Sequence, residues 1–118
     1  MKTILICDDS PVEITNLSKI LDDAGCNVFK ATNGQEAIKL AKENKPDLIF
    51  MDIVMPDMDG YAACRELTTA AETKDLPVVF VSSKGQKADR VWAKMQGAKD
   101  LVQKPYEANE IISQIQAI

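Results

Sequence analysis

Three short stretches of this chain, residues 4–7, 48–51 and 78–81, are apolar at every position and do not alternate with polar residues. Strands of this kind are buried on both faces, which occurs in parallel sheets that carry helices on each side. Parallel strands also need long crossover connections, and these are usually helices. This pattern therefore predicts an α/β fold.

Amphipathic stretches lie between the apolar runs along the whole chain. The first begins with Ser10 as a helix N-cap, Pro11 at the first helical position and Glu13 as the partner of Ser10 in a capping box. Weaker strands are expected at residues 27–31 and 99–102. The other four helices are expected between Gly34 and Lys45, at residues 61–69, at 88–95 and at 108–115.

Repeated strand–helix units with right-handed crossovers predict one doubly wound fold. We expect a five-stranded parallel sheet in the order 2-1-3-4-5, flanked by five helices in a flavodoxin-like arrangement. The 118 residues suit a single domain that fills positions 1–118, with no output domain after it. Within the fourth helix, Ala88, Val91, Trp92 and Met95 recur at helical spacing. We expect this row to face the core, with Trp92 buried; the alternative is an exposed anchor for a partner.

Charge and residue content exclude several classes of function. The net charge is −4 without a basic cluster, which argues against a nucleic-acid partner. No stretch approaches the ~18 consecutive apolar residues of a membrane span. The three cysteines, Cys7, Cys26 and Cys64, have no metal-like spacing, so we expect reduced thiols in a cytoplasmic protein. The absence of histidine excludes histidine-based acid–base and metal chemistry.

Polar side chains follow four of the five expected strands. Asp8 and Asp9 follow the first strand, Asp52 the third, Ser82 the fourth and Lys104 the fifth. Taken singly, each could be a solvated turn residue, a helix cap or a surface lysine. Ligands of open α/β sheets bind beyond the carboxyl ends of the strands, so their joint placement favours one functional site there.

The chemistry of these side chains is mutually consistent. Three neighbouring carboxylates repel one another unless a cation compensates, and carboxylates with water are the ligands that Mg²⁺ prefers. A carboxylate can also attack phosphorus and form an aspartyl phosphate. Mg²⁺ and the ammonium of Lys104 would stabilise charge on the transferring group, and the hydroxyl of Ser82 could donate to a phosphoryl oxygen.

These residues carry a resemblance that spans the chain in order. The chain resembles the stand-alone, CheY-like receiver domains of two-component response regulators at Asp8-Asp9, Asp52, Met55-Pro56, Asp59-Gly60, Ser82 and Lys104-Pro105. Residues 91–98 also resemble the single-domain PilH-type regulators of twitching motility. That finer likeness implies a role in type IV pilus or chemotaxis-like motility control.

The resemblance implies a role for each acidic residue. Asp52 would accept the phosphoryl group from the phosphohistidine of a histidine kinase or phosphotransfer protein. Asp9, Asp52 and the backbone carbonyl of Val54 would bind Mg²⁺ directly, and Asp8 would act through metal-bound water. The protein would not be an enzyme in the usual sense, because it would catalyse only its own phosphorylation and dephosphorylation.

The resemblance also implies how the signal leaves the domain. Lys104 would bind the phosphoryl group, and Ser82 would rearrange to meet it and so change the face formed by helix four, strand five and helix five, where a target protein binds. Many receivers have an aromatic residue three positions before the lysine, but this chain has Leu101. The usual aromatic part of the switch is therefore in question. Without an output domain, the chain would act by binding a partner or as a sink for phosphoryl groups.

Three other functions remain open at this stage. A flavodoxin-like electron carrier would need a phosphate-cradling loop after the first strand, where Asp8 and Asp9 would repel phosphate. An aspartate-based hydrolase would typically have a second aspartate two residues after the nucleophile, where Val54 stands. An interaction module that never takes phosphate would not need the complete acidic set and Lys104.

Overall fold

Five parallel strands form one sheet in the order β2-β1-β3-β4-β5, in a computed structural model that describes all 118 residues. This is the strand order expected from the sequence. The strands are β1 (Thr3–Cys7), β2 (Asn27–Ala31), β3 (Leu48–Met51), β4 (Val78–Ser82) and β5 (Asp100–Gln103).

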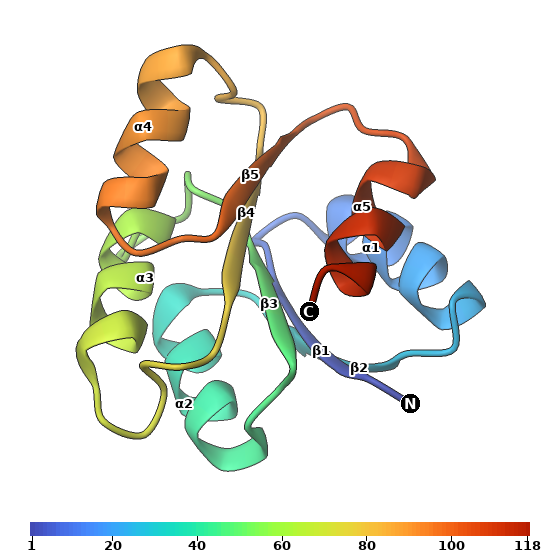
Figure 1. Ribbon diagram of the computed structural model, residues 1–118, viewed down its shortest axis with the longest axis horizontal. Helices are drawn as coiled ribbons and strands as arrows, with labels where there is room; N and C mark the ends of the chain where they lie inside the picture. The colour runs from blue at the N-terminus through green and yellow to red at the C-terminus, as the bar shows by residue number, and fades with distance from the viewer.

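The helices cover both faces of the sheet, so the doubly wound architecture is confirmed. In Figure 1, α1 and α5 lie on one side of the strands and α2, α3 and α4 lie on the other. The helices are α1 (Pro11–Asp23), α2 (Gly34–Asn44), α3 (Gly60–Thr69), α4 (Lys87–Met95) and α5 (Ala108–Gln116). None of them is long and apolar enough to cross a membrane.

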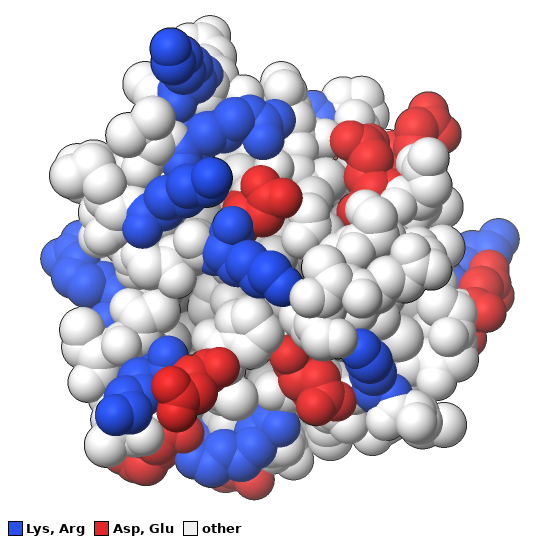
Figure 2. Space-filling model, in the orientation of Figure 1, with Lys and Arg blue, Asp and Glu red and all other residues white.

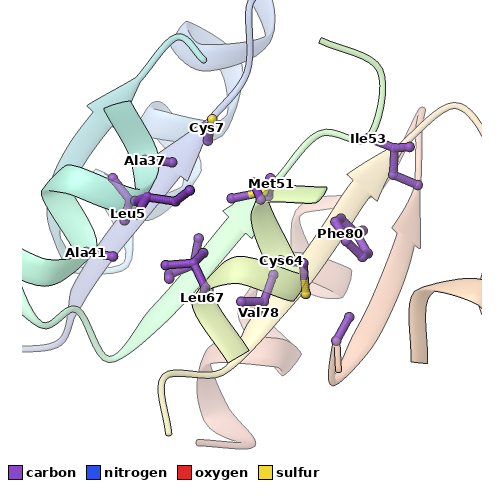
Figure 3. Packing of buried hydrophobic residues seen from close by; sticks show 14 of the residues in the cluster. Leu5, Cys7, Ala37, Ala41, Met51, Ile53, Cys64, Leu67, Val78 and Phe80 are labelled. Atoms are coloured by element: carbon purple, nitrogen blue, oxygen red, sulfur yellow. The ribbon is translucent and has the colours of Figure 1, made fainter. Parts of the chain in front are cut away.

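Successive residues of each strand enter two different core layers. Leu5 and Cys7 of β1 pack under α2 and α3, whereas Ile4 and Ile6 pack under α1 and α5. Figure 3 shows the first of these layers, with Leu67 of α3 among the strand side chains. A fully buried aliphatic side chain contributes about 1.5–3 kcal/mol, so burial on both faces strongly favours these runs as strands. This explains why the runs are apolar at every position.

The start of α1 differs from its sequence interpretation. The hydroxyl of Ser10 accepts a hydrogen bond from the Glu13 amide at 3.4 Å, as expected for an N-cap. The reciprocal half of the capping box does not form, because the amide of Ser10 donates to Asp8 Oδ1 at 2.9 Å. The carboxylate of Glu13 lies 3.7 Å from the ammonium of Lys104. Asp8 thus takes the hydrogen bond from the Ser10 amide and leaves the Glu13 carboxylate free to approach Lys104.

The expectation that α4 buries its apolar row was wrong. Val91, Trp92 and Met95 are 52%, 46% and 67% exposed, and Ala88 is also exposed. The only buried residue of α4 is Ala93, whose small side chain packs in the same core layer as Phe80. Helical spacing shows that the row lies on one side of the helix, but it does not show which side meets the sheet.

The three cysteines are free thiols, as expected. Cys7 and Cys64 are buried, and Cys26 is partly exposed. Burial raises the pKa of the Cys7 and Cys64 thiols to about 12, so both stay protonated near neutral pH. They serve as small core residues and not as reactive groups.

Candidate functional site

Backbone hydrogen bonds beyond the strand ends bring the expected site residues to one edge of the sheet. The amide of Asp8 donates to the Ala31 carbonyl at 3.1 Å, and the amide of Asp52 donates to the Cys7 carbonyl at 2.9 Å. The Lys104 amide donates to the carbonyl of Ser82 at 2.8 Å. These bonds extend the parallel ladders by one residue and position each side chain beside the next strand end.

Asp8, Asp9 and Asp52 form one cluster of carboxylates. Each offers an oxygen, and these oxygens all lie within 4.8 Å of one another. Their environments differ, because Asp8 is buried, Asp52 is partly buried and Asp9 is exposed. The structure therefore confirms that the three acidic residues gather at the carboxyl ends of β1 and β3.

Asp8 is the most firmly held of the three. Its Oδ1 accepts from the Ser10 amide at 2.9 Å, and its Oδ2 accepts from Lys104 Nζ at 2.8 Å. Both oxygens are thus engaged by the protein. Asp9 and the backbone carbonyl of Val54, in contrast, accept no hydrogen bond from the protein.

Lys104 is the cation of the cluster. Its Nζ lies 2.8 Å from Asp8, 3.7 Å from Glu13 and 3.8 Å from Asp52. Burial alone would lower the pKa of Lys104, but the hydrogen bond to Asp8 and the charge of Asp52 outweigh burial and raise it. Lys104 therefore stays charged throughout the physiological pH range.

Asp52 is only partly compensated by this cation. Desolvation by burial raises the pKa of Asp52 to about 6, against the lowering effect of Lys104. The negative charge of Asp8 raises this pKa further, and the hydrogen bond from the Ile53 amide to Oδ1 at 2.8 Å lowers it. With a pKa of about 6, Asp52 is mostly ionised at pH 7. Its charge is in an unfavourable environment, because Lys104 lies closer to Asp8 than to Asp52.

Ser82 lies at the end of β4 and is completely buried. Its hydroxyl accepts a hydrogen bond from the Lys84 amide at 3.1 Å. It makes no hydrogen bond to Asp52 or Lys104, so in this conformation the side chain shapes the start of the β4–α4 loop. A hydroxyl of this kind can redirect its proton toward another acceptor without a change of backbone fold.

The donor set of the acidic cluster fits a hard divalent cation. It consists of carboxylate oxygens only, carries several negative charges and includes Asp9, whose carboxylate accepts no hydrogen bond from the protein. Mg²⁺ prefers such oxygen donors and keeps several waters. The residues present are therefore suited to Mg²⁺.

Comparison with known proteins decides the family. Residues 4–116 match the response regulator receiver domain family. This chain belongs to that family. It is 45% identical over its whole length to the protein PilH of Pseudomonas aeruginosa and covers 98% of that relative. It is also 34% identical to the transcriptional regulator RpaA of a Synechocystis species, but it spans only about half (49%) of that longer protein.

Solved receiver structures share the fold of this receiver. The chemotaxis protein CheY4 of Vibrio cholerae has a TM-score of 0.93 at 26% identity, with 100% of this chain and 98% of that chain covered. The receiver domain of the sensor histidine kinase PA1611 of Pseudomonas aeruginosa has a TM-score of 0.91 at 28% identity, with 98% and 95% covered. That structure holds a magnesium ion in its active-site cleft.

The site of this receiver includes a charged residue that the sequence interpretation assigned only to helix capping. Glu13 belongs to the first turn of α1 and adds a fourth carboxylate around Lys104. The signal was available in principle, because a helix that follows β1 starts at the same edge as the carboxyl ends of the strands.

Gly60 positions the backbone beside Asp52. Its amide donates to the Ile53 carbonyl at 2.7 Å, and a Cβ on Gly60 would lie 2.9 Å from Ile53 Cα and still closer to the Asp52 carbonyl oxygen. Only glycine allows α3 to begin this close to β3. The Asp59-Gly60 pair therefore combines a helix cap, in which Asp59 accepts from the Ala62 amide at 2.8 Å, with a close backbone approach.

We expect Gly60→Ala to lower the free energy of unfolding by about 2 kcal/mol or more, because the new methyl group meets backbone that cannot move aside. The matched control is Gly34→Ala, since Gly34 is also the first residue of its helix, but a Cβ there would lie 3.1 Å from the side chain and the carbonyl oxygen of Met58, which is less close than the contacts at Gly60. Urea denaturation of both variants measures the difference. An equal loss in the two variants would contradict the proposed role of Gly60.

We expect Asp52→Asn to stabilise the metal-free receiver at pH 7.5 by about 1–3 kcal/mol. The pKa of Asp52 is raised to about 6 in the folded state, above its usual value of 3.8. The carboxyl therefore favours folding below about pH 4, and this contribution is lost as the pH rises through about 6. Asparagine cannot ionise, so the gain should disappear toward pH 4.

Denaturation in EDTA between pH 4 and 8 tests this expectation. The matched control is Asp75→Asn, because Asp75 is an exposed aspartate outside the site. A stability gain for Asp52→Asn that does not depend on pH would show that ionisation of Asp52 is not its cause.

Proposed function

We propose that this receiver accepts a phosphoryl group on Asp52, from a histidine kinase or a phosphotransfer protein, and so controls a phosphorylation-dependent partner. The observation that carries the proposal is the placement of the Asp52 carboxylate 3.8 Å from the ammonium of Lys104, within a cluster of acidic oxygens. Such a site offers a nucleophile, a fixed cation and a place for a divalent ion. The flavodoxin-like interpretation is disfavoured, because Asp8 and Asp9 follow β1 where a flavin phosphate would bind.

In the proposed reaction, an oxygen of Asp52 attacks phosphorus and the bond from phosphorus to the donor nitrogen breaks. Attack requires the carboxylate form, which predominates above the pKa of about 6. Lys104 moves its charge from Asp8 and Asp52 toward the new phosphoryl oxygens, because phosphorylation adds negative charge beside it. The protein acts only on its own aspartate and thus differs from a conventional enzyme.

Mg²⁺ would be held by Asp9, Asp52 and the carbonyl of Val54, with Asp8 acting through a metal-bound water. When bound, the ion supplies positive charge that neutralises the transferring group. Asp8 suits the indirect role, because both of its oxygens are already bonded to Ser10 and Lys104. Asp9 and Val54 suit direct binding, because their oxygens have no protein partner.

We also propose that the signal leaves through the β4–α4 loop. Ser82 begins this loop, and Arg90 of α4 ties the loop to β5 by donating to the Gly85 carbonyl at 3.2 Å and to the Leu101 carbonyl at 2.8 Å. Leu101 is only 4% exposed, so it has no inward movement left to make. A shift of Ser82 toward a phosphoryl oxygen would move the loop and change the face formed by α4, β5 and α5.

The relationship to PilH supports a role in type IV pilus or chemotaxis-like motility control. We place this role in the cytoplasm. The chain would act as a single domain at residues 1–118, by partner binding or as a phosphoryl sink. Its partners would be a kinase or phosphotransfer protein and a target on the α4–β5–α5 face, with no nucleic acid or membrane involved.

Treatment with acetyl phosphate and Mg²⁺ tests the assignment of the nucleophile. We expect intact-mass spectrometry to show one added phosphoryl group on the wild type, none on Asp52→Asn, and none on the wild type in EDTA. Asp75→Asn serves as the control and should be labelled fully, because it leaves the site unchanged. Labelling of Asp52→Asn at the wild-type level would reject Asp52, and no labelling of any protein would favour an interaction module that takes no phosphate.

Chemical-shift mapping with a phosphoryl mimic such as beryllium fluoride tests the route of the signal. We expect Ser82→Ala to suppress the perturbations on α4 by more than half, because the hydroxyl that follows the phosphoryl group is lost. Leu101→Ala should leave most of them in place, because Leu101 is already buried. The opposite pattern, with perturbations abolished only by Leu101→Ala, would show that the switch depends on Leu101.

A further inference from the structure

The apolar row of α4 faces away from the sheet and is the largest concentration of exposed apolar side chains in the protein. The chain exposes six large apolar residues, and three of them, Val91, Trp92 and Met95, lie within five positions on α4. The other three, Met1, Val12 and Val54, are scattered. We name the surface formed by Ala88, Val91, Trp92 and Met95 the α4 strip; exposed rows of this kind commonly mark interaction sites.

A row of basic side chains runs beside the α4 strip. Lys87, Arg90 and Lys94 recur at spacings of three and four residues, which places them along one side of the helix. Residues 84–99 contain five basic residues and one acidic residue, in a chain whose net charge is −4. Figure 2 shows blue Lys and Arg side chains gathered at the upper left, where Figure 1 places α4.

Aromatic contacts with the neighbouring helix α3 fix the position of Trp92 in the α4 strip. The rings of Trp92 and Tyr61 of α3 pack edge-on with their centroids 6.3 Å apart. The rings of Tyr61 and the buried Phe80 pack in the same way with their centroids 5.3 Å apart. The end of α4 is also fixed to α3, because the carbonyl of Gln96 accepts from Cys64 Sγ at 3.4 Å and from Thr68 Oγ1 at 3.2 Å. A positioned tryptophan loses little conformational freedom on binding and so is suited to act as an anchor.

We propose that the α4 strip docks an acidic amphipathic helix of another protein. The apolar face of that helix would cover Trp92, Val91 and Met95, and carboxylates along its edge would pair with Lys87 and Lys94. Arg90 would add positive charge to this edge while its guanidinium stays bonded to the Gly85 and Leu101 carbonyls. From Ala88 to Met95 the strip extends over about two helical turns, or roughly 10 Å, which matches a short helix laid along it. Trp92 contacts Tyr61 of α3, so the apolar row borders α3. Arg90 donates to the Leu101 carbonyl, so the basic row lies on the side of α4 that faces β5.

The charge pattern disfavours the two other occupants of such a surface. A second copy of this chain in a two-fold arrangement would bring the basic row of one protomer against that of the other. A membrane would be met by a chain of net charge −4, and a nine-residue helix presents only three large apolar side chains to it. An acidic partner gains from both the apolar row and the basic row.

The single tryptophan gives a direct readout, because Trp92 is the only one in the chain. The probe is a synthetic 18-residue helix-forming peptide with leucine on one face and glutamate along the edges; the control peptide carries lysine at each glutamate position. We expect the glutamate peptide to shift the Trp92 emission to shorter wavelength with saturation, and the lysine peptide to bind at least about tenfold more weakly, a difference of about 1.4 kcal/mol.

A matched pair of variants locates the binding. Val91→Glu should weaken binding of the glutamate peptide at least about tenfold. Val12→Glu, at an exposed valine of α1, should leave this binding unchanged. Both variants should melt like the wild type and still be phosphorylated by acetyl phosphate, so failure of this inference is separable from failure of the Asp52 assignment.

Four results would overturn the proposal. The first is that the lysine peptide binds as tightly as the glutamate peptide. The second is that Val12→Glu weakens binding of the glutamate peptide as much as Val91→Glu does. The third is that the emission of Trp92 does not respond to the glutamate peptide. The fourth is an emission shift produced without peptide, either by raising the protein concentration, which would indicate a second copy, or by adding vesicles of phosphatidylcholine and phosphatidylglycerol, which would indicate a membrane.

Discussion

The contact between Lys104 and the carboxylates of Asp8 and Asp52 is the interaction on which the site depends. One ammonium lies 2.8 Å from Asp8 and 3.8 Å from Asp52, and it cannot neutralise three clustered carboxylates. The remaining negative charge makes the edge of the sheet a place for a cation, and the incomplete compensation leaves the pKa of Asp52 raised to about 6. The cluster is thus arranged for chemistry at some expense of stability.

The sheet supplies the rigidity that this charge cluster requires. Every strand residue of β3 is buried, and the ladder continues beyond it to the amide of Asp52. The two core layers hold β3 from both sides, so the carboxylate of Asp52 is presented from the most restrained part of the fold. Gly60 completes this support, since it allows α3 to start against the backbone of Asp52.

In contrast to β3, the helix α4 has few buried contacts with the rest of the protein. It buries a single residue, Ala93, and packs only Trp92 against an aromatic ring of α3; its ends are held by hydrogen bonds, from Arg90 to β5 and from α3 to Gln96. Hydrogen bonds at a partly exposed surface can be exchanged at small cost, whereas buried apolar contacts cannot. A helix attached in this way can respond to a change at Ser82 and still present the α4 strip to a partner.

The sequence by itself determined the parallel sheet and the joint placement of five side chains at its carboxyl edge, because strands that are apolar at every position are buried on both faces and ligands bind beyond the carboxyl ends of such strands. These side chains are Asp8, Asp9, Asp52, Ser82 and Lys104. The strand order was assumed from the usual flavodoxin-like arrangement and is established only by the tertiary structure. The sequence placed Glu13 near the site but did not decide whether its carboxylate caps the helix or pairs with Lys104, since a glutamate at this position can do either. It also misplaced Trp92. Helical periodicity records which side chains share a face, but only packing against α3, β4 and β5 decides that Ala93 faces the sheet and the α4 strip faces solvent.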